Sequence, residues 1–259
     1  MTWAAGRALL ALTLLAGVAV GSPAQDTAAV VARHVLPFDA TRLRPFRRAY
    51  DMIVHTRDSG IVIGQREVIL APATYAGKPA WLLVESRSGL VPAAETLYVD
   101  PDMRPLHWYA AQSDARMGAT FVADTVFGAA SAPAGSQSLI IAGRPDLLVS
   151  QAMIEMVLPL LPLTAEWTDS AAVLAVDLAA AAVIPVELSV IGEEPVLIDS
   201  THSHPAWVVA MRAEARTILL WIDRESGEVY RVQQPLPTHV GTLLEYRWRS
   251  DATPPSLSH

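Results

Sequence analysis

The stretch Thr96–Trp108, TLYVDPDMRPLHW, has a counterpart much later in the chain, Leu220–Tyr230, LWIDRESGEVY. In each, an apolar run ends at an aspartate, a short polar segment follows, and a second apolar run begins. A short carboxylate accepts hydrogen bonds from backbone N–H groups further along, so Asp100 and Asp223 each predict a tight turn between strands. The alternative is chance similarity between two strand–turn–strand units. Taken as equivalent hairpins, the copies predict a long, curled antiparallel sheet.

Short apolar or alternating runs continue on both sides of these copies, and turn residues separate them. Such punctuation indicates an antiparallel meander of about a dozen strands, hence a mainly β fold. Gly192-Glu193-Glu194 predicts one further turn, and Ala129–Gly135, AASAPAG, predicts a loop of small residues. The predicted strands are Ala49–Arg57, Ile61–Leu70, Ala80–Ser86, Glu95–Val99, Leu106–Gln112, Ala115–Val122, Ala171–Asp177, Val183–Ile191, Val196–Asp199, Trp207–Ala215, Thr217–Ile222, Val229–Gln233 and Gly241–Trp248.

One segment has the period of a helix instead. Asp146 is a suitable N-cap, because its side chain can accept a hydrogen bond from a free backbone N–H. Pro159 ends the helix, since it donates no hydrogen bond and its ring opposes the carbonyl four residues back. The apolar stripe between them consists of Val149, Ala152, Met153, Met156, Val157 and Leu160.

Composition and charge exclude several classes of protein. The chain has 259 residues, 52% hydrophobic and 17% charged, which is enough apolar material for a core and too much for a disordered chain. The net charge of −7 argues against nucleic acid as a partner, because phosphate binding needs a basic surface. Cysteine is absent, which excludes disulfides, thiolate metal sites, a cysteine nucleophile and a lipid-modified N-terminal cysteine.

The N-terminus has the pattern of a secretory signal. Arg7 precedes an apolar core of 13 residues, Ala8–Val20, and Ser22-Pro23-Ala24 predicts cleavage before Gln25. The alternative, a membrane anchor, needs roughly 20 apolar residues. Loss of Arg7 would leave 18 basic and 26 acidic residues, a net charge of −8. The sequence therefore predicts a periplasmic or secreted protein.

The division of the chain into segments follows from its local composition. The apolar run Ala171–Val190 contains Asp177, Pro185 and Glu187, so it predicts buried strands, and no membrane span is expected in the mature chain. We expect a signal peptide at 1–24, an N-terminal extension at 25–44, a single β-rich domain at 45–249 and a flexible tail at 250–259.

Few residues suggest chemistry. In Thr201-His202-Ser203-His204, two imidazoles two apart on a strand point the same way and can share a metal, but a catalytic zinc needs a third convergent ligand. Asp199, Glu194 or His239 are the residues that could supply it. The Gly-x-Ser-x-Gly and His-Glu-x-x-His motifs and a glycine-rich phosphate loop are absent. We therefore expect no catalytic residue, no metal and no cofactor.

Three segments resemble a known family. Val190–Val196 has a V-x-Gly-x-Glu-x-V turn, Trp207–Glu214 is a strand that begins with an aromatic residue, and Leu220–Arg231 is a hairpin with the pattern hydrophobic-Asp-x-x-x-Gly-x-hydrophobic. Together they resemble bacterial exported domain-of-unknown-function proteins related to periplasmic lipoprotein carriers. The resemblance, over roughly 50–246, implies a half-open β-barrel with one helix packed on its concave side and an apolar concavity. The Ala- and Pro-rich segment Ala165–Pro185 departs from that family.

This leads to a hypothesis about function and two alternatives. The leading hypothesis is an exported, non-catalytic protein that binds an apolar or lipid-like ligand, or a lipidated partner, in the half-barrel. The alternatives are an envelope protein–protein interaction module without a small ligand, and a metal-dependent hydrolase using His202 and His204. The sequence does not determine the oligomeric state. The candidate cavity residues, which could instead simply fill the core, are Trp81, Trp108, Met153, Met156, Trp207 and Trp221.

Overall fold

The computed structural model describes residues 36–249, except positions 58, 91, 134, 143–146, 177–180, 200, 214–215 and 237–240. The expected signal peptide, the first part of the extension, the tail and the expected cap Asp146 lie outside the described residues. The strands are β1 Phe46–His55, β2 Gly60–Tyr75, β3 Lys78–Gly89, β4 Ala93–Val99, β5 Pro105–Gln112, β6 Ala115–Val122, β7 Thr125–Ala132, β8 Gly135–Ala142, β9 Leu147–Leu148, β10 Thr168–Val176, β11 Ala181–Leu197, β12 Ser203–Ala213, β13 Arg216–Asp223, β14 Val229–Pro235 and β15 Leu243–Trp248. The helical segments are η1 Ala40–Arg42, α1 Gln151–Val157 and η2 Leu158–Leu160.

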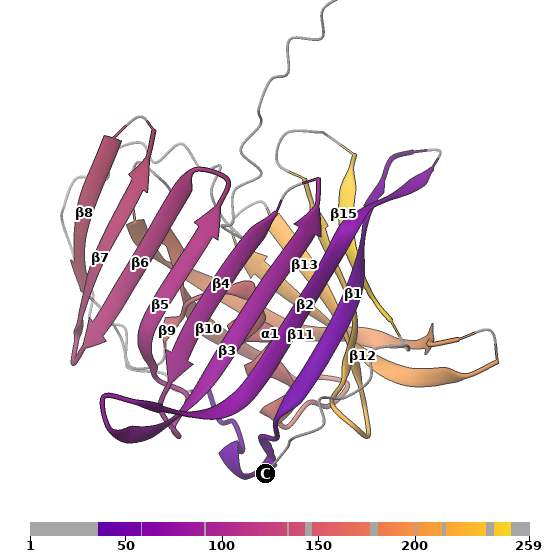
Figure 1. The fold of residues 1–259 in the computed structure, drawn as a ribbon. Coiled ribbons are helices and arrows are strands. Elements are labelled where there is room, and N and C mark those ends of the chain that lie inside the picture. Colours follow the sequence, from indigo (N-terminus) through magenta and orange to yellow (C-terminus); the bar gives the residue numbers. More distant parts are fainter. Residues whose placement is uncertain are drawn as a thin grey trace, which may run out of the picture.

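All of these strands belong to one sheet, in the order β8-β7-β6-β5-β4-β3-β2-β1-β15-β14-β13-β12-β11-β10-β9. The chain starts in the middle of the sheet, runs outward as a meander to β8, and continues at the opposite edge with β9. After α1 it returns as a second meander to β15, which pairs with β1. Figure 1 shows the first meander in front of the second, with α1 on the concave side. The expected fold, a curled and open antiparallel sheet with one helix, is confirmed.

The two aspartate turns are confirmed by their hydrogen bonds. Asp100 Oδ1 accepts from the backbone N–H groups of Asp102 and Arg104 at 2.9 and 2.8 Å. Asp223 Oδ1 accepts from the backbone N–H groups of Glu225 and Ser226 at 3.0 and 2.6 Å. In both hairpins the carboxylate satisfies the backbone donors of the turn, as the sequence indicates.

A third turn of this kind escaped the sequence analysis. Asp199 Oδ1 accepts from the backbone N–H groups of Thr201 and His202 at 2.7 and 2.8 Å, between β11 and β12. The predicted turn at Gly192-Glu193-Glu194 is wrong, because β11 continues to Leu197. A β-bulge between Val190 and Gly192 absorbs the irregularity, and pairing with β12 then resumes.

The predicted loop Ala129–Gly135 is also wrong. β7 continues through Ala132 and β8 begins at Gly135, so most of this segment is a hairpin. Small residues suit close packing there: Ala130 is buried, and a Cβ added to Gly128 would lie 3.2 Å from the carbonyl oxygen of Gly118. The alanines were mistaken for loop residues because their hydrophobic alternation is weak.

The helix is shorter than its sequence period suggests. It begins at Gln151, and Ser150 is its N-cap, with Oγ accepting from the backbone N–H of Met153 at 3.2 Å. The expected apolar stripe is buried, and the chain tightens into η2 at Pro159, where we expected the helix to end. No helix among the described residues is long and apolar enough to cross a membrane.

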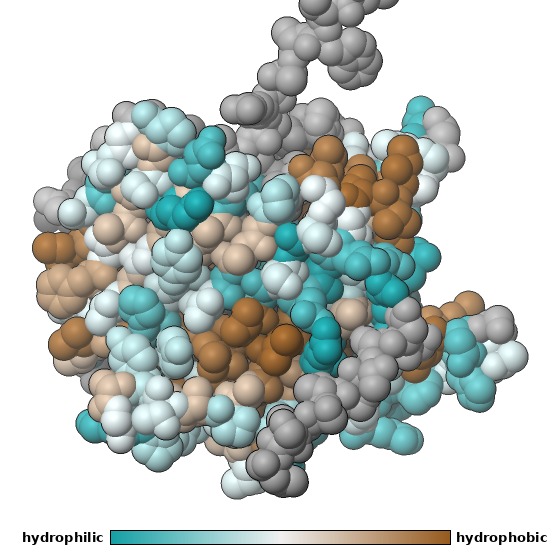
Figure 2. Space-filling model, viewed as in Figure 1, coloured by the Kyte–Doolittle hydropathy of each residue, from teal (hydrophilic) through white to brown (hydrophobic). Residues whose placement is uncertain are grey.

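The described part of the expected extension, residues 36–44, packs against the domain. Leu36 and Leu43 are buried in the core, and the backbone N–H of Asp39 donates to the carbonyl of Leu160 at 3.0 Å. This segment therefore contacts the end of the helical region. On the outside, Figure 2 shows apolar surface over the β1–β2 hairpin, where Ile61 and Val62 are exposed.

Candidate functional site

The concave face of the first meander carries a charged band beside apolar rows. Strand register places Tyr50, Arg66 and Arg87 opposite one another on β1, β2 and β3. One row further along, Glu85 of β3 lies opposite Glu95 of β4. Residues two apart on a strand share a face, so the rows beyond these consist of core residues, Leu70, Leu83, Leu97 and Trp108 among them.

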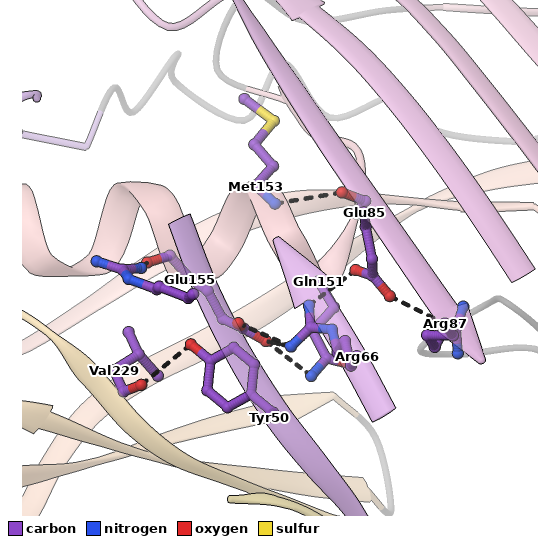
Figure 3. A network of polar contacts seen from close by, with 10 residues as sticks. Tyr50, Arg66, Glu85, Arg87, Gln151, Met153, Glu155 and Val229 are labelled. Carbon is purple, nitrogen blue, oxygen red and sulfur yellow. Dashed lines mark hydrogen bonds and ion pairs between the residues drawn. The ribbon is translucent and has the colours of Figure 1, made fainter. Parts of the chain in front are cut away.

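Arg66 links this band to the helix. It is 1% exposed, and its Nη1 donates to both carboxylate oxygens of Glu155 at 2.8 and 2.9 Å. Its Nη2 donates to Glu85 at 2.8 Å, as Figure 3 shows from close by. The guanidinium lies 4.7 Å from the ring centroid of Tyr246 and 5.5 Å from that of Tyr50. Because one guanidinium nitrogen holds Glu155 of the helix and the other holds Glu85 of the sheet, Arg66 fixes the position of α1 on the sheet.

Burial and charge act in opposite directions on this network. Burial disfavours the charged guanidinium, but Glu155 and Glu85 outweigh it and raise the pKa of Arg66 well above its usual value. Burial likewise opposes ionisation of Glu85, but Arg66 and Arg87 lower the pKa of that carboxyl. Arg66 is therefore a permanent cation held by carboxylates in the interior.

Glu95 has no positively charged partner in this network. Glu85, Glu95 and Glu155 are three buried carboxyls, whereas Arg66 and Arg87 supply two guanidiniums. Burial, followed by repulsion from Glu85, raises the pKa of Glu95 to about 7, despite a hydrogen bond from Ser150. Within the described part of the chain, its Oε1 has no hydrogen-bond partner. Glu95 is therefore a neutral acid below about pH 7.

A second set of contacts ties α1 to the second meander. Arg48 is buried, and its Nε donates to Glu228 at 2.7 Å while its Nη1 donates to the backbone carbonyl of Glu155 at 3.3 Å. The hydroxyl of Tyr50 donates to the carbonyl of Val229 at 3.0 Å. Arg48 of β1 thus joins α1 to Glu228 of the second meander.

The six candidate cavity residues do not all lie in one place. Trp108, Met153 and Met156 are buried in the main core, and Trp81 and Trp207 are partly buried against it. Trp221 belongs to a smaller apolar cluster with Val196, Ala206, Val208 and Tyr230. There its Nε1 donates to Glu194 at 2.8 Å, and the guanidinium of Arg231 lies 3.6 Å from its ring centroid.

Beside this smaller cluster lies a cleft of about 350 Å³. Tyr230 and Trp248 meet in it with ring centroids 5.0 Å apart. Leu197, at its rim, is 72% exposed. The lining residues are Pro195, Val196, Leu197, Ile198, Tyr230, Arg231, Arg247 and Trp248.

The two histidines of the THSH segment have separate partners. His202 Nδ1 lies 2.9 Å from Asp199 Oδ2 in the exposed turn, whereas His204 Nδ1 lies 3.1 Å from Asp223 Oδ2. Among the residues that the structure describes, no group of three or more histidine, aspartate or glutamate side chains is arranged to hold a metal. His239 lies outside those residues.

The sequence analysis did not identify the charged band. Arg66 shares a strand face with Val68 and Leu70, and Glu95 shares one with Leu97. The sequence signal for this band is therefore a charged residue on the same strand face as apolar residues. It identifies a buried charge, but it does not identify the partner, which lies far away in sequence.

Comparison with known proteins supports the fold. No family model matches the chain, and no curated protein matches it. Among solved structures, a β-barrel-like protein of a domain of unknown function, DUF1849, from Brucella abortus matches with a TM-score of 0.53 and 14% identity, over 80% of this chain and 96% of that one. A LolA superfamily protein from Nitrosomonas europaea covers 83% of this chain and 86% of its own, at 12% identity, with a TM-score of 0.18, too low to carry an argument. The expected resemblance to barrel-like proteins of unknown function is thus confirmed at the level of the fold.

Proposed function

We propose that the protein is exported and binds an apolar or amphipathic molecule, such as an acyl chain or the lipid of a lipidated partner, inside the half-barrel without a chemical step. One observation carries the proposal. An open sheet has an apolar concave face, and a single short helix covers that face while ion pairs tether it.

The helix is a suitable element for displacement. α1 has seven residues, and isolated helices of fewer than about 12–15 residues are marginal in water, so its position depends on its contacts. Its residues Met153, Ile154 and Met156 are at most 2% exposed, so a ligand must take their place on the sheet. Each methylene buried contributes about 0.8 kcal/mol, and an acyl chain of ordinary length reaches micromolar affinity after its ordering costs.

The two sheet edges suggest where a chain would enter. β8 and β9 end the sheet at opposite sides and are consecutive along the chain. Leu139 and Ile141 of β8 pack against the core, and Leu147 and Leu148 of β9 are buried in it. Apolar side chains therefore border the opening on both sides.

Native mass spectrometry and solvent extraction of the mature protein test the proposal. We expect a co-purifying lipid, or saturable binding of a fatty-acid probe after delipidation. A delipidated, folded protein that binds no acyl probe would refute the proposed function.

Quenching of tryptophan fluorescence by a dibromo-stearate probe tests where the acyl chain binds. The double variant Trp221→Phe/Trp248→Phe removes both tryptophans next to the cleft lined by Tyr230 and Trp248, which we call the outer cleft. We expect the probe still to quench this variant, since the interior tryptophans remain. Loss of quenching in this variant would place the chain at the outer face instead.

One observation favours the interaction module as a second candidate. Figure 1 shows the hairpin of β11 and β12 projecting beyond the rest of the sheet. Leu197 and Ile191 are exposed on this hairpin, at 72% and 49%, next to the outer cleft. A photo-crosslinking residue at Leu197 should give a discrete protein adduct in cells if this function is correct, and one at the equally exposed Ile140 of β8 should not. Equal labelling at both positions would argue against it.

A further inference from the structure

Two buried polar groups on neighbouring strands have unmet hydrogen-bonding capacity. Glu95 of β4 is 6% exposed and Trp108 of β5 is 4% exposed. Across the residues that the structure describes, neither the Oε1 of Glu95 nor the Nε1 of Trp108 has a hydrogen-bond partner. Buried polar groups are satisfied in the great majority of cases, so a pair left open within one core needs an explanation.

The register brings these groups to the same place. Glu95 lies opposite Ala110, and Leu97 lies opposite Trp108, so Glu95 and Trp108 are diagonal neighbours on one face of the sheet. Diagonal neighbours are about 7–8 Å apart, within reach of long and aromatic side chains. Leu97, Trp108 and Ala110 belong to the same core as α1, so this face is the concave one.

The groups around Glu95 make it a hydrogen-bond donor. Its titratable neighbours are Glu85, Arg66 and Arg87, and both guanidiniums are engaged by Glu85 and Glu155. A third buried carboxylate would lack a counter-charge, so Glu95 keeps its proton below its pKa of about 7. A carboxylic acid O–H and an indole N–H then face the interior together, and both need an acceptor.

We propose that Glu95 and Trp108 form the polar end of the interior site and both donate to the carbonyl oxygen of an acyl ester, whose chain lies along the neighbouring apolar side chains. This inference rests on the proposed function. Apolar residues of the same core on β4, β6 and β7 supply the chain's contacts, through Leu97, Val99, Ala119 and Val126.

Ser150 connects this site to the helix. Its hydroxyl hydrogen-bonds to Glu95, and its Oγ caps α1 by accepting from the backbone N–H of Met153. The ester accepts a hydrogen bond from the carboxylic O–H of Glu95, at the oxygen that has no partner, whereas Ser150 hydrogen-bonds to the other oxygen, so the ester lies next to the cap of α1.

Competition against the dibromo-stearate probe tests the pair. Methyl decanoate and undecane have chains of comparable length, and only the ester carries acceptors. In the wild type we expect the ester to bind more tightly. Trp108→Phe and Glu95→Leu should each weaken ester binding about five- to tenfold and leave undecane unchanged, whereas Glu95→Gln, whose amide still donates, should preserve the preference. A short-chain phosphatidylglycerol and a diacylglyceryl-cysteine peptide then distinguish a membrane lipid from a lipidated protein as the source of the ester.

A measurement on the wild type avoids dependence on variant folding. The indole N–H resonance of Trp108, assigned by its loss in Trp108→Phe, should shift downfield with the ester and stay in place with undecane. An unchanged resonance, together with equal ester preference in all variants, would overturn the polar site and leave the proposed function standing. Failure of the wild type to bind either probe would overturn both.

Discussion

Arg66 shows how a single residue can determine the arrangement of a core. It lies on a strand face with Val68 and Leu70, yet its guanidinium joins Glu85 on the sheet to Glu155 on the helix. A buried ion pair contributes little net stability compared with an apolar core, because desolvation offsets its attraction. Its effect is on geometry, since only one position of α1 satisfies both carboxylates.

Replacement of Arg66 by methionine should lower the free energy of unfolding by about 3–5 kcal/mol, because two carboxylates would remain buried without a partner. The triple variant Arg66→Met/Glu85→Leu/Glu155→Leu should recover much of this loss. Urea denaturation measures both. Arg47→Met, which removes an exposed ion pair with Glu67, is the matched control and should cost less than about 1 kcal/mol. Equal losses at positions 47 and 66 would contradict this account.

Glu95 predicts a pH dependence with a definite sign. Its pKa rises from 4.5 to about 7 in the folded protein, so the folded state holds a proton that the unfolded state releases. Its contribution to stability is complete below about pH 4.5 and is lost as the pH rises to about 7. Glu95→Gln, which mimics the neutral acid, should therefore gain stability relative to wild type between pH 5 and 8, by at most about 3 kcal/mol. A difference in urea midpoint that is constant over this range would contradict the prediction.

At the scale of elements, the hairpins depend on aspartates that satisfy their turns. Asp223 is the most buried of the three at its side chain, and the β13–β14 turn that it closes packs against the helical region. Gly227 in this turn has a positive φ of 73°, and a Cβ there would lie 3.2 Å from Pro159 Cβ. The turn therefore positions η2 as well as joining two strands.

Asp223→Ala should lower the free energy of unfolding by about 2 kcal/mol, because the backbone N–H groups of Glu225 and Ser226 would lose their acceptor in a partly buried turn. Asp199→Ala should cost less, since its turn is exposed and water can replace the carboxylate. Thermal unfolding of the two variants checks the order. A larger effect at position 199 would show that burial of the turn is not the deciding factor.

At the scale of the whole molecule, the two ends of the domain meet in the middle of the sheet. Tyr50 of β1 lies opposite Trp248 of β15, and Met52 lies opposite Tyr246. The two meanders are joined through this pair of strands, and β15 contributes the buried residues Leu244 and Tyr246 to the core. The first and last strands of the domain therefore pair with each other and join the two meanders into one sheet.

Deletion of residues 243–259 should abolish cooperative unfolding, because β1 and β14 would both become unpaired edges and the core would lose Tyr246. Deletion of residues 251–259 is the control and should change the melting temperature by no more than about 2 °C. Circular dichroism during heating compares the two. A cooperative transition in the longer deletion would show that the meanders fold independently.

The class of fold, the two aspartate hairpins and the apolar stripe of the helix could all be predicted from the amino-acid sequence. These features depend on neighbours within a few residues, through strand alternation, turn hydrogen bonds and helical period. Where that local signal was weak, as in Ala129–Gly135, the prediction failed. The bulge after Val190 also left no local mark that distinguished it from a turn.

The pairing of charged side chains in the interior depends on how the whole sheet packs. Arg66 and Glu155 are 89 positions apart, and the local pattern that marks Arg66 as buried does not identify Glu155 as its partner. Their pairing depends on the side of the sheet to which the chain returns after β8, and on the rotation of α1 against β2. Likewise, Trp108 and Trp221 are similar in sequence context but lie in different apolar clusters, because burial is a property of the packed sheet and not of the strand alone.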